Sequence, residues 1–205
     1  IPVIRILKEG LIGNKISKIY GILNGTSNYI LSNMEKIKMD FETVLKKAKE
    51  LGYAESNPKS DLNGEDVKSK IQILSSLAFN CFINKSKINL EGINNVDQID
   101  IKNARILGYK IKHLGVAELE NGKLIQGVYP CLVKKESHIS NVNDVLNAII
   151  IEGKPIGKLV IQGEGAGPGP TVSALVSDIC SILRGNINFP FSASQANRKK
   201  ITSLD

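Results

Sequence analysis

The chain has 205 residues, of which 42% are hydrophobic and 23% are charged, and this balance is typical of one globular domain, or of two small ones, with a sizeable core. The formal net charge is +7, but only four of the 27 basic residues are arginines, the lysines are scattered, and aromatic residues make up 5% of the chain. Because nucleic-acid interfaces favour clustered arginines with interleaved aromatic rings, we expect no nucleic-acid partner.

The first half of the chain is predicted to be mainly helical, because its apolar residues recur at intervals of three and four. Helices are expected at 2–10, 27–37, 40–52 and 64–80, with one strand at 14–23 and a polar loop at 53–63. Asp40 is placed as an N-cap and Gly52 as a C-terminal stop of the third helix.

In the second half the period changes to that of strands. A short strand is expected at 87–93, a helix at 96–109, a β-hairpin at 110–133, two strands at 146–153 and 157–163, and a final helix at 171–183. Asn121 and Gly122 supply the turn signal of the hairpin. Helices followed by a run of strands predict an α+β fold, with a two-layer mixed or antiparallel sheet covered by helices.

No apolar run approaches the roughly 18 to 20 residues that a membrane span needs, and the chain does not open on a secretory leader. We therefore expect a cytoplasmic protein with no membrane partner. Cys81, Cys131 and Cys180 are widely spaced in apolar surroundings, without the CxxC spacing of a metal or redox pair. All three are expected to be buried, reduced thiols.

The segment GEGAGPGP at 163–170 resembles a dinucleotide-binding turn, but its spacing does not fit. A third glycine of G-x-G-x-x-G would fall on Pro168 or on Pro170. Two interpretations stay open from these residues alone. The glycines serve either a strand-to-helix turn with unusual backbone angles or the close approach of the backbone to a ligand.

The segment NGTSN at 24–28 also has two interpretations. Its Asn, Thr or Ser side chains can cap the following helix, and its hydroxyl and free amides at a strand end can bind a carboxylate. The two histidines, His113 and His138, have no carboxylate or Cys at ligand spacing. Neither is assigned a role.

The stretch YAESNPKSDLNGEDVKSK at 53–70 contains the most informative charged residues. Asp66 and Lys70 form an i,i+4 pair, a geometry that contributes only about 0.2–0.5 kcal/mol on an exposed helix. By helical periodicity, however, Lys70 projects about 50° from the centre of the apolar stripe, and Lys68 roughly twice as far. This places Lys70 half-buried, where a lysine beside a carboxylate is suited to proton transfer. Glu55 and Asp61, on the adjoining loop, are suitable acceptors for an amino group.

Several long motifs, in order, resemble those of the homoserine dehydrogenase family. They are IPVI, YGILNGTSNYIL, LGYAESNPKSDLNGEDVKSKIQILSSLAF, LGYKIKHLGVAE and GEGAGPGPTVSALVSDI, and together they extend over nearly the whole chain. The resemblance implies an NAD(P)-dependent oxidoreductase that interconverts L-homoserine and L-aspartate 4-semialdehyde in threonine, methionine and isoleucine biosynthesis.

The resemblance also implies a role for each matching residue. Lys70 matches the family's proton donor and Asp66 its accompanying acid, both catalytic. The substrate-binding positions of the family match Glu55, Asp61, Tyr53, Gly25 and Thr26. The family segment that lies beside the nicotinamide matches Gly163, Gly165 and Gly167. The family residue whose backbone carbonyl contributes to a monovalent-cation site matches Ile1.

Two departures from the family pattern leave these roles untouched. Asn57 stands where an acid is usual, and Lys68 where a small residue is common.

The family's upstream nucleotide-binding domain has no counterpart in this sequence, so residues 1–205 are expected to be one catalytic and dimerisation domain. We expect this domain to form a homodimer and to be inactive in isolation. The alternative is a non-catalytic, dimerising or metabolite-sensing relative that retains the pocket.

Overall fold

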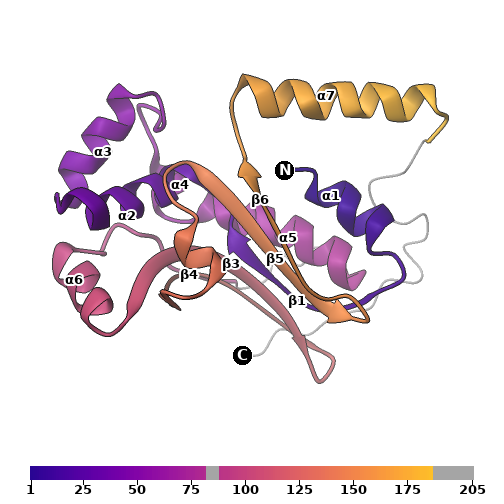
Figure 1. Ribbon diagram of the computed structural model, residues 1–205, viewed down its shortest axis with the longest axis horizontal. Coiled ribbons are helices and arrows are strands. Elements are labelled where there is room, and N and C mark those ends of the chain that lie inside the picture. The colour runs from indigo at the N-terminus through magenta and orange to yellow at the C-terminus, as the bar shows by residue number, and fades with distance from the viewer. Residues whose placement is uncertain (82–87, 187–205) are drawn as a thin grey trace.

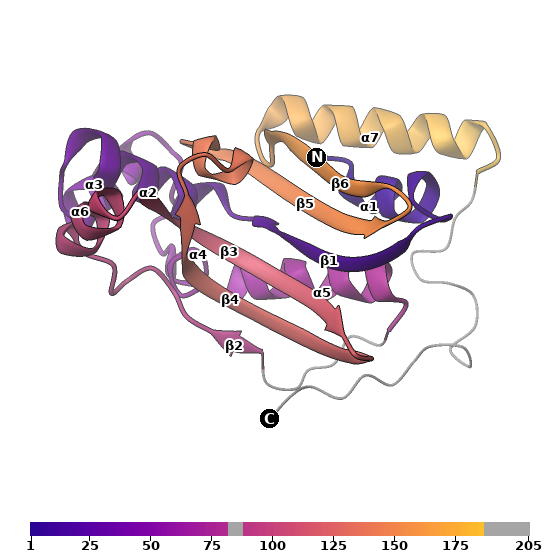
Figure 2. The ribbon, with the colours of Figure 1, turned by 60° about the horizontal axis from the view of Figure 1, so that its bottom comes forward.

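The computed structural model describes residues 1–81 and 88–186, and its centre is one six-stranded sheet (Figure 1). The strands lie in the order β2-β4-β3-β1-β5-β6 (Figure 2). Their bounds are Lys15–Ile22 for β1, Asn89–Leu90 for β2, Tyr109–Glu120 for β3, Lys123–Lys134 for β4, Leu146–Lys154 for β5 and Gly157–Glu164 for β6. β2 pairs with β4 in parallel and all other neighbours are antiparallel. The predicted mixed sheet is confirmed; residue 87 of the first expected strand lies outside the described residues.

Helices account for most of the remaining described residues. Their bounds are Val3–Arg5 for α1, Ile6–Gly10 for the π-helical turn η1, Gly25–Ile37 for α2, Phe41–Glu50 for α3, Lys59–Leu62 for α4, Glu65–Phe79 for α5, Gln98–Ile106 for α6, His138–Asn141 for the 3-10 turn η2 and Pro168–Leu183 for α7. The prediction of an unbroken loop at 53–63 was wrong, because α4 forms within it. Its amides at Asp61 and Leu62 bond to the carbonyl of Pro58, which starts the turn.

The β3–β4 hairpin forms at the predicted turn. Asn121 and Gly122 have φ angles of 49° and 80°, so both central residues adopt the left-handed conformation that a type I′ turn requires. Glu120 pairs with Lys123 directly across the turn. The turn thereby sets the register of two twelve-residue strands.

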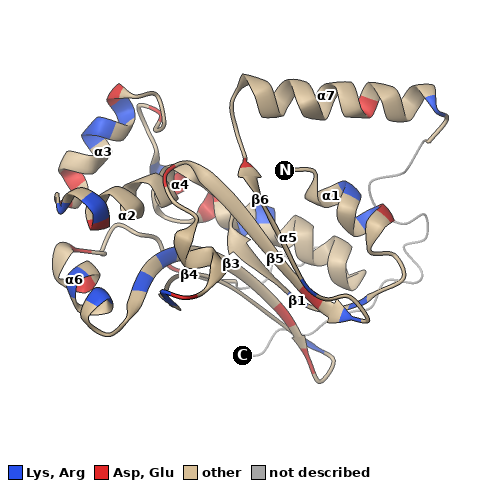
Figure 3. Cartoon of the chain, in the orientation of Figure 1, with Lys and Arg blue, Asp and Glu red and all other residues tan. Residues whose placement is uncertain are grey.

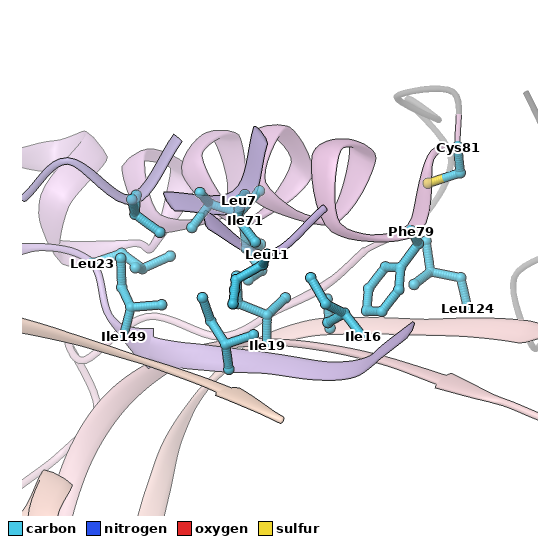
Figure 4. Close-up of a cluster of buried hydrophobic side chains, with 14 of the residues drawn as sticks. Leu7, Leu11, Ile16, Ile19, Leu23, Ile71, Phe79, Cys81, Leu124 and Ile149 are labelled. Atoms are coloured by element: carbon cyan, nitrogen blue, oxygen red, sulfur yellow. The ribbon is translucent and has the colours of Figure 1, made fainter. Parts of the chain in front are cut away.

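One face of the sheet packs against α5 and η1 (Figure 4). Ile19 on β1, Ile151 on β5 and Ile71 on α5 are all 0% exposed, and burial of each such side chain contributes about 1.5–3 kcal/mol. At Gly115 on β3 an added Cβ would lie 3.0 Å from Val67 Cγ1. The close approach of α5 to the sheet fixes the helix that carries Asp66 and Lys70.

A second cluster joins α2, α3 and α6 at one end of the sheet (Figure 1). Ile30 and Met34 on α2 and Val44 on α3 are 0% exposed. Asp40 caps α3 by accepting the N–H of Thr43 at 2.9 Å, as predicted. This packing holds α2, whose first residues contribute to the candidate site.

A buried lysine on β3 connects α2 to the segment that precedes β5. Lys112 is 1% exposed, and its Nζ donates to Val142 O at 2.6 Å, Asn143 Oδ1 at 3.1 Å, Asn28 Oδ1 at 3.2 Å and Ser32 Oγ at 3.4 Å. Burial, reinforced by nearby Lys110, lowers the pKa of Lys112 to about 8. The ammonium is thus held by neutral oxygens.

The last helix, α7, lies clear of the sheet (Figure 1), and none of its residues is buried. It carries few charges (Figure 3), and Arg5 holds it by donating to Ser177 Oγ at 2.8 Å and to Asp178 Oδ1 at 3.0 Å.

The prediction of three buried thiols was wrong. Cys81 is buried, Cys131 is partly buried and Cys180, on α7, is exposed. Among the described residues no helix is both long and apolar enough to cross a bilayer.

Candidate active site

The first element of the site is the junction between β1 and α2. Asn24 is the N-cap of α2 in an extended conformation, and its Oδ1 accepts the N–H of Ser27 at 2.8 Å. At Gly25 an added Cβ would lie 2.9 Å from Val145 O, so the chain passes too close here for a larger residue. Thr26 Oγ1 donates to Tyr53 O at 2.7 Å. The capping interpretation of NGTSN is confirmed at Asn24, while Thr26 ties this segment to the loop that precedes α4.

The second element is the first turn of α5. Gly64, with φ of 87°, precedes the helix, and an added Cβ there would lie 2.8 Å from Leu90 Cδ1. Asp66 follows in the first turn, where a carboxylate is favoured by the helix dipole. One turn later, Lys70 Nζ donates to Asp66 Oδ2 at 2.7 Å and to Leu23 O at 3.0 Å. An ammonium has three N–H donors, so one is left for another acceptor.

The prediction that Lys70 is less exposed than Lys68 was wrong. The Lys70 side chain is 48% exposed and that of Lys68 is 28% exposed. Lys68 folds back along α5 to Glu65, with Nζ 3.1 Å from Oε2, whereas Lys70 extends from the helix toward the end of β1. Helical periodicity places the Cβ atoms but does not determine where a long, flexible side chain ends.

Asn24 links the two elements and was not recognised as a site residue from the sequence. Its Nδ2 donates to Asp61 Oδ1 and to Asp66 Oδ2, each at 2.8 Å. The hydrogen bonds therefore run without a break from Asp61 through Asn24 and Asp66 to Lys70. Two residues, 37 and 42 positions from Asn24 in the sequence, meet it in this way. The only signal in the sequence was that Asn24 occupies a cap position.

Tyr53 and Glu55, which the resemblance assigns to substrate binding, lie on the loop that precedes α4. The ring of Tyr53 is tilted against that of Tyr29, with the centroids 5.0 Å apart, and Tyr53 is 43% exposed. Glu55 is also exposed. Within the part of the chain that the structure describes, no hydrogen bond or ion pair involves the carboxylate of Glu55, which leaves it available to a ligand.

The glycine-rich segment lies at the other side of the start of β5. An added Cβ at Gly165 would lie 2.2 Å from Asn147 Nδ2, and one at Gly163 would lie 3.6 Å from Ile1 Cγ1. Gly167 has a φ of 105° immediately before α7, so this turn does need the backbone freedom of glycine. Val145 contacts Gly25 and Asn147 contacts Gly165. The segments 24–28 and 163–170 therefore both lie against the short stretch 145–147.

Ile1 begins the described chain, and its backbone carbonyl is the atom that the resemblance associates with a monovalent cation. This carbonyl accepts the N–H of Val3 at 2.9 Å. Nowhere in residues 1–81 and 88–186 do three His, Cys, Asp or Glu side chains come together where a metal could bind. The role of the Ile1 carbonyl stays a prediction.

Among the described residues, no hydrogen bond joins either histidine to the network of Asp61, Asn24, Asp66 and Lys70. His113 is 1% exposed on β3, and its Nε2 lies 3.0 Å from Glu91 O. Burial lowers the pKa of His113, which favours the neutral ring. His138 is in η2.

Comparison with known proteins identifies the family. The model of the family "Homoserine dehydrogenase" matches residues 2–180. The homoserine dehydrogenase of Neisseria gonorrhoeae is 46% identical over 185 residues, which are 90% of this chain and 42% of that protein. This chain thus spans less than half the length of that relative.

Solved structures agree. A homoserine dehydrogenase from Thiobacillus denitrificans superposes with a TM-score of 0.92 at 36% identity, over 100% of this chain and 49% of that one. The Staphylococcus aureus enzyme at pH 6.5 gives a TM-score of 0.80 at 42% identity, over 88% of this chain and 45% of that one. The chain therefore belongs to the homoserine dehydrogenase family.

Proposed function

We propose that this chain is the substrate-binding, catalytic and dimerisation domain of an NAD(P)-dependent homoserine dehydrogenase that is longer than the chain itself. The enzyme interconverts L-homoserine and L-aspartate 4-semialdehyde for threonine, methionine and isoleucine biosynthesis in the cytoplasm. Family membership supports the reaction class. The observation that carries the proposal is the Lys70 ammonium, which is held by Asp66 and by Leu23 O with one N–H left over.

Lys70 is the proposed proton donor in semialdehyde reduction. As the carbonyl carbon gains a hydride and its C=O π bond breaks, the oxygen takes a proton from Lys70 Nζ, which becomes a neutral amine and is reprotonated from solvent. Asp66 keeps Nζ in position for the transfer by accepting its hydrogen bond. In the oxidation of homoserine the same amine, unprotonated, removes the hydroxyl proton.

Glu55 and Asp61 are proposed to bind the substrate ammonium. The carboxylate of Glu55 has no partner in the described part of the chain, and Asp61 uses one oxygen for Asn24, so both can accept N–H donors. Tyr53 lies two positions before Glu55 and Gly25 directly follows Asn24. Thr26 joins the two segments by donating to Tyr53 O. All three residues are proposed to contact the substrate from the side of α2.

Gly163, Gly165 and Gly167 are proposed to contact the nicotinamide end of NAD or NADP. The amide of Asn147 lies against Gly165, and its Oδ1 is a buried acceptor with no partner among the described residues. Both features fit the close approach of a polar ring to this segment. When bound, the cofactor supplies the hydride. Its remaining contacts are proposed to come from a nucleotide-binding domain outside this chain.

The proposal is tested with the enzyme that contains this chain together with its nucleotide-binding domain. Homoserine-dependent reduction of NAD or NADP is the expected activity, and loss of homoserine binding in a Glu55→Gln variant is the expected effect on substrate recognition. Absence of turnover with both cofactors at saturating homoserine would overturn the proposal in favour of the sensing relative.

A further inference from the structure

Asn24 is the residue at which the two halves of the candidate site meet. It is 5% exposed, yet its amide faces two carboxylates from separate segments. Nδ2 lies 2.8 Å from both Asp61 Oδ1 and Asp66 Oδ2, while Oδ1 accepts the N–H of Ser27 at 2.8 Å. Both N–H groups and the carbonyl are thus in use. The orientation of the amide is fixed, because a flipped amide would direct its oxygen at two carboxylates.

Helix capping alone does not explain an asparagine here. Serine caps equally well, and aspartate adds a negative charge that the N-terminus of a helix favours. Only asparagine combines the acceptor that the cap needs with the two donors that Asp61 and Asp66 need. A carboxylate at this position would place a third negative charge between two others.

We infer that Asn24 is a positioning residue for the proton transfer. Its amide holds Asp66 in the orientation from which Oδ2 binds Lys70 Nζ, and it fixes Asp61 in the same network. Leu23, the preceding residue, supplies its carbonyl to Lys70 at 3.0 Å, so adjacent residues of one junction hold the ammonium from two directions. This inference rests on the proposed role of Lys70, and the effect of Asn24 reaches Lys70 through Asp66.

Two substitutions distinguish the hydrogen bonds from Asn24 to Asp61 and Asp66 from the capping of α2. Asn24→Ser keeps a capping oxygen but is too short to reach the carboxylates, and Asn24→Asp keeps the cap but replaces the donors with a negative charge. Thermal unfolding of the 205-residue chain at pH 8 should give a Tm for Asn24→Asp that is about 2 °C or more below that of Asn24→Ser. The gap should close toward pH 4, where carboxylates take up protons.

The cap of α3 is the matched control. Asp40 accepts the N–H and the hydroxyl of Thr43 and bridges no carboxylates, so Asp40→Ser should be no more stable than the unsubstituted chain at pH 8. If Asn24→Asp is as stable as Asn24→Ser, or more stable, Asn24 is only a cap and the inference fails.

Kinetics of the complete enzyme test the positioning itself. Asn24→Ser should lower kcat roughly 10- to 100-fold with the KM of the cofactor unchanged. In semialdehyde reduction, Asn24→Asp should move the alkaline limb of the kcat profile to higher pH than in Asn24→Ser, because the added charge favours the ammonium form of Lys70. If Asn24 only caps α2, neither kcat nor the alkaline limb of the pH profile should change.

The outcomes distinguish this inference from the proposed function. Unchanged kcat and an unchanged pH profile in both variants, in an enzyme that oxidises homoserine, would overturn the positioning role alone. An unsubstituted enzyme that does not oxidise homoserine would overturn the proposed function. In that case the order of the two Tm values still decides whether the Asn24 amide bridges Asp61 and Asp66.

Discussion

Asp66 Oδ2 accepts hydrogen bonds from both Lys70 Nζ, at 2.7 Å, and Asn24 Nδ2, at 2.8 Å. The Lys70–Asp66 pair is an i,i+4 pair whose lysine side chain is 48% exposed, and as a contribution to stability alone it amounts to about 0.2–0.5 kcal/mol. The pair matters for the orientation of Lys70, because Asp66 Oδ2 and Leu23 O together hold the ammonium at the end of β1. The structural and catalytic interpretations of Lys70 therefore predict different outcomes.

Substitution of Lys70 by methionine distinguishes these interpretations in the complete enzyme. Lys70→Met preserves length and helix propensity and removes the proton donor, so kcat should fall about 10²- to 10⁴-fold with cofactor affinity preserved. Steady-state kinetics in both directions and circular dichroism measure this. Lys68→Met is the control, because Lys68 pairs with Glu65 instead. Small and equal effects of the two substitutions on kcat would refute the assignment.

The 205-residue chain alone should show no detectable homoserine oxidation. The segment at 163–167 lies against Asn147 of β5, and a single glycine turn cannot replace a nucleotide-binding domain's hold on a dinucleotide. Turnover assays and calorimetric titrations with NAD and NADP measure this, with the complete enzyme as the positive control. Cofactor-dependent turnover by the pure chain would mean that the domain assignment is wrong.

The chain should self-associate through its sheet. On the face opposite α5, which Figure 2 views, Val116, Tyr20, Ile150 and Val160 lie side by side across β3, β1, β5 and β6. Ile150 is already buried, but Val160 is 37% exposed on the edge strand β6, and an apolar residue on an open strand edge is suited to be covered by a second copy. Sedimentation at several concentrations should therefore give a homodimer.

A charge on this row tests the location of the interface. Val160→Lys should weaken the dimer, whereas Ile106→Lys, at a position on α6 that is 70% exposed, should leave it intact. A monomer at high micromolar concentration for the unsubstituted chain would rule out the prediction.

Local sequence signals predicted those parts of the fold that local chemistry determines. The Asn121–Gly122 turn and the Asp40 cap form as expected, because each depends on a few adjacent residues. The turn of α4 was missed because Asn57 and Pro58, which directly precede it, are typical of loops, although Pro58 is the N-cap of α4. Local propensity is a weak guide where a single turn is stabilised by its neighbours.

Contacts between distant segments could not be predicted in the same way. Asn24 meets Asp66 across 42 positions, and nothing local distinguishes it from an ordinary cap. Cys180 lies in an apolar helix that was expected to be buried, yet α7 has no buried residue. Burial depends on what the fold brings to a surface, and periodicity alone does not supply that information.

Lys112 provides a prediction about stability that is independent of activity. The pKa of Lys112 is lowered from 10.5 to about 8, chiefly by burial and then by Lys110, while Glu35 and Asp144 oppose the shift. Between these two pH values the unfolded chain holds a proton that the folded chain has released, so the free energy of unfolding rises with pH across this window. Below pH 8 both states are protonated and the full cost of burying the ammonium is present.

The comparison of Lys112→Met with the unsubstituted chain isolates this effect, because titrations elsewhere are common to both. The unfolding free energy of the unsubstituted chain, relative to that of Lys112→Met, should increase by about 3 kcal/mol from pH 7.5 to pH 10.5. Urea unfolding at four pH values measures the difference. Lys134→Met, at an exposed strand position on β4, should show no such change. A flat difference for Lys112→Met would show that the four oxygens around Nζ offset the cost of burial and that the amine stays protonated throughout.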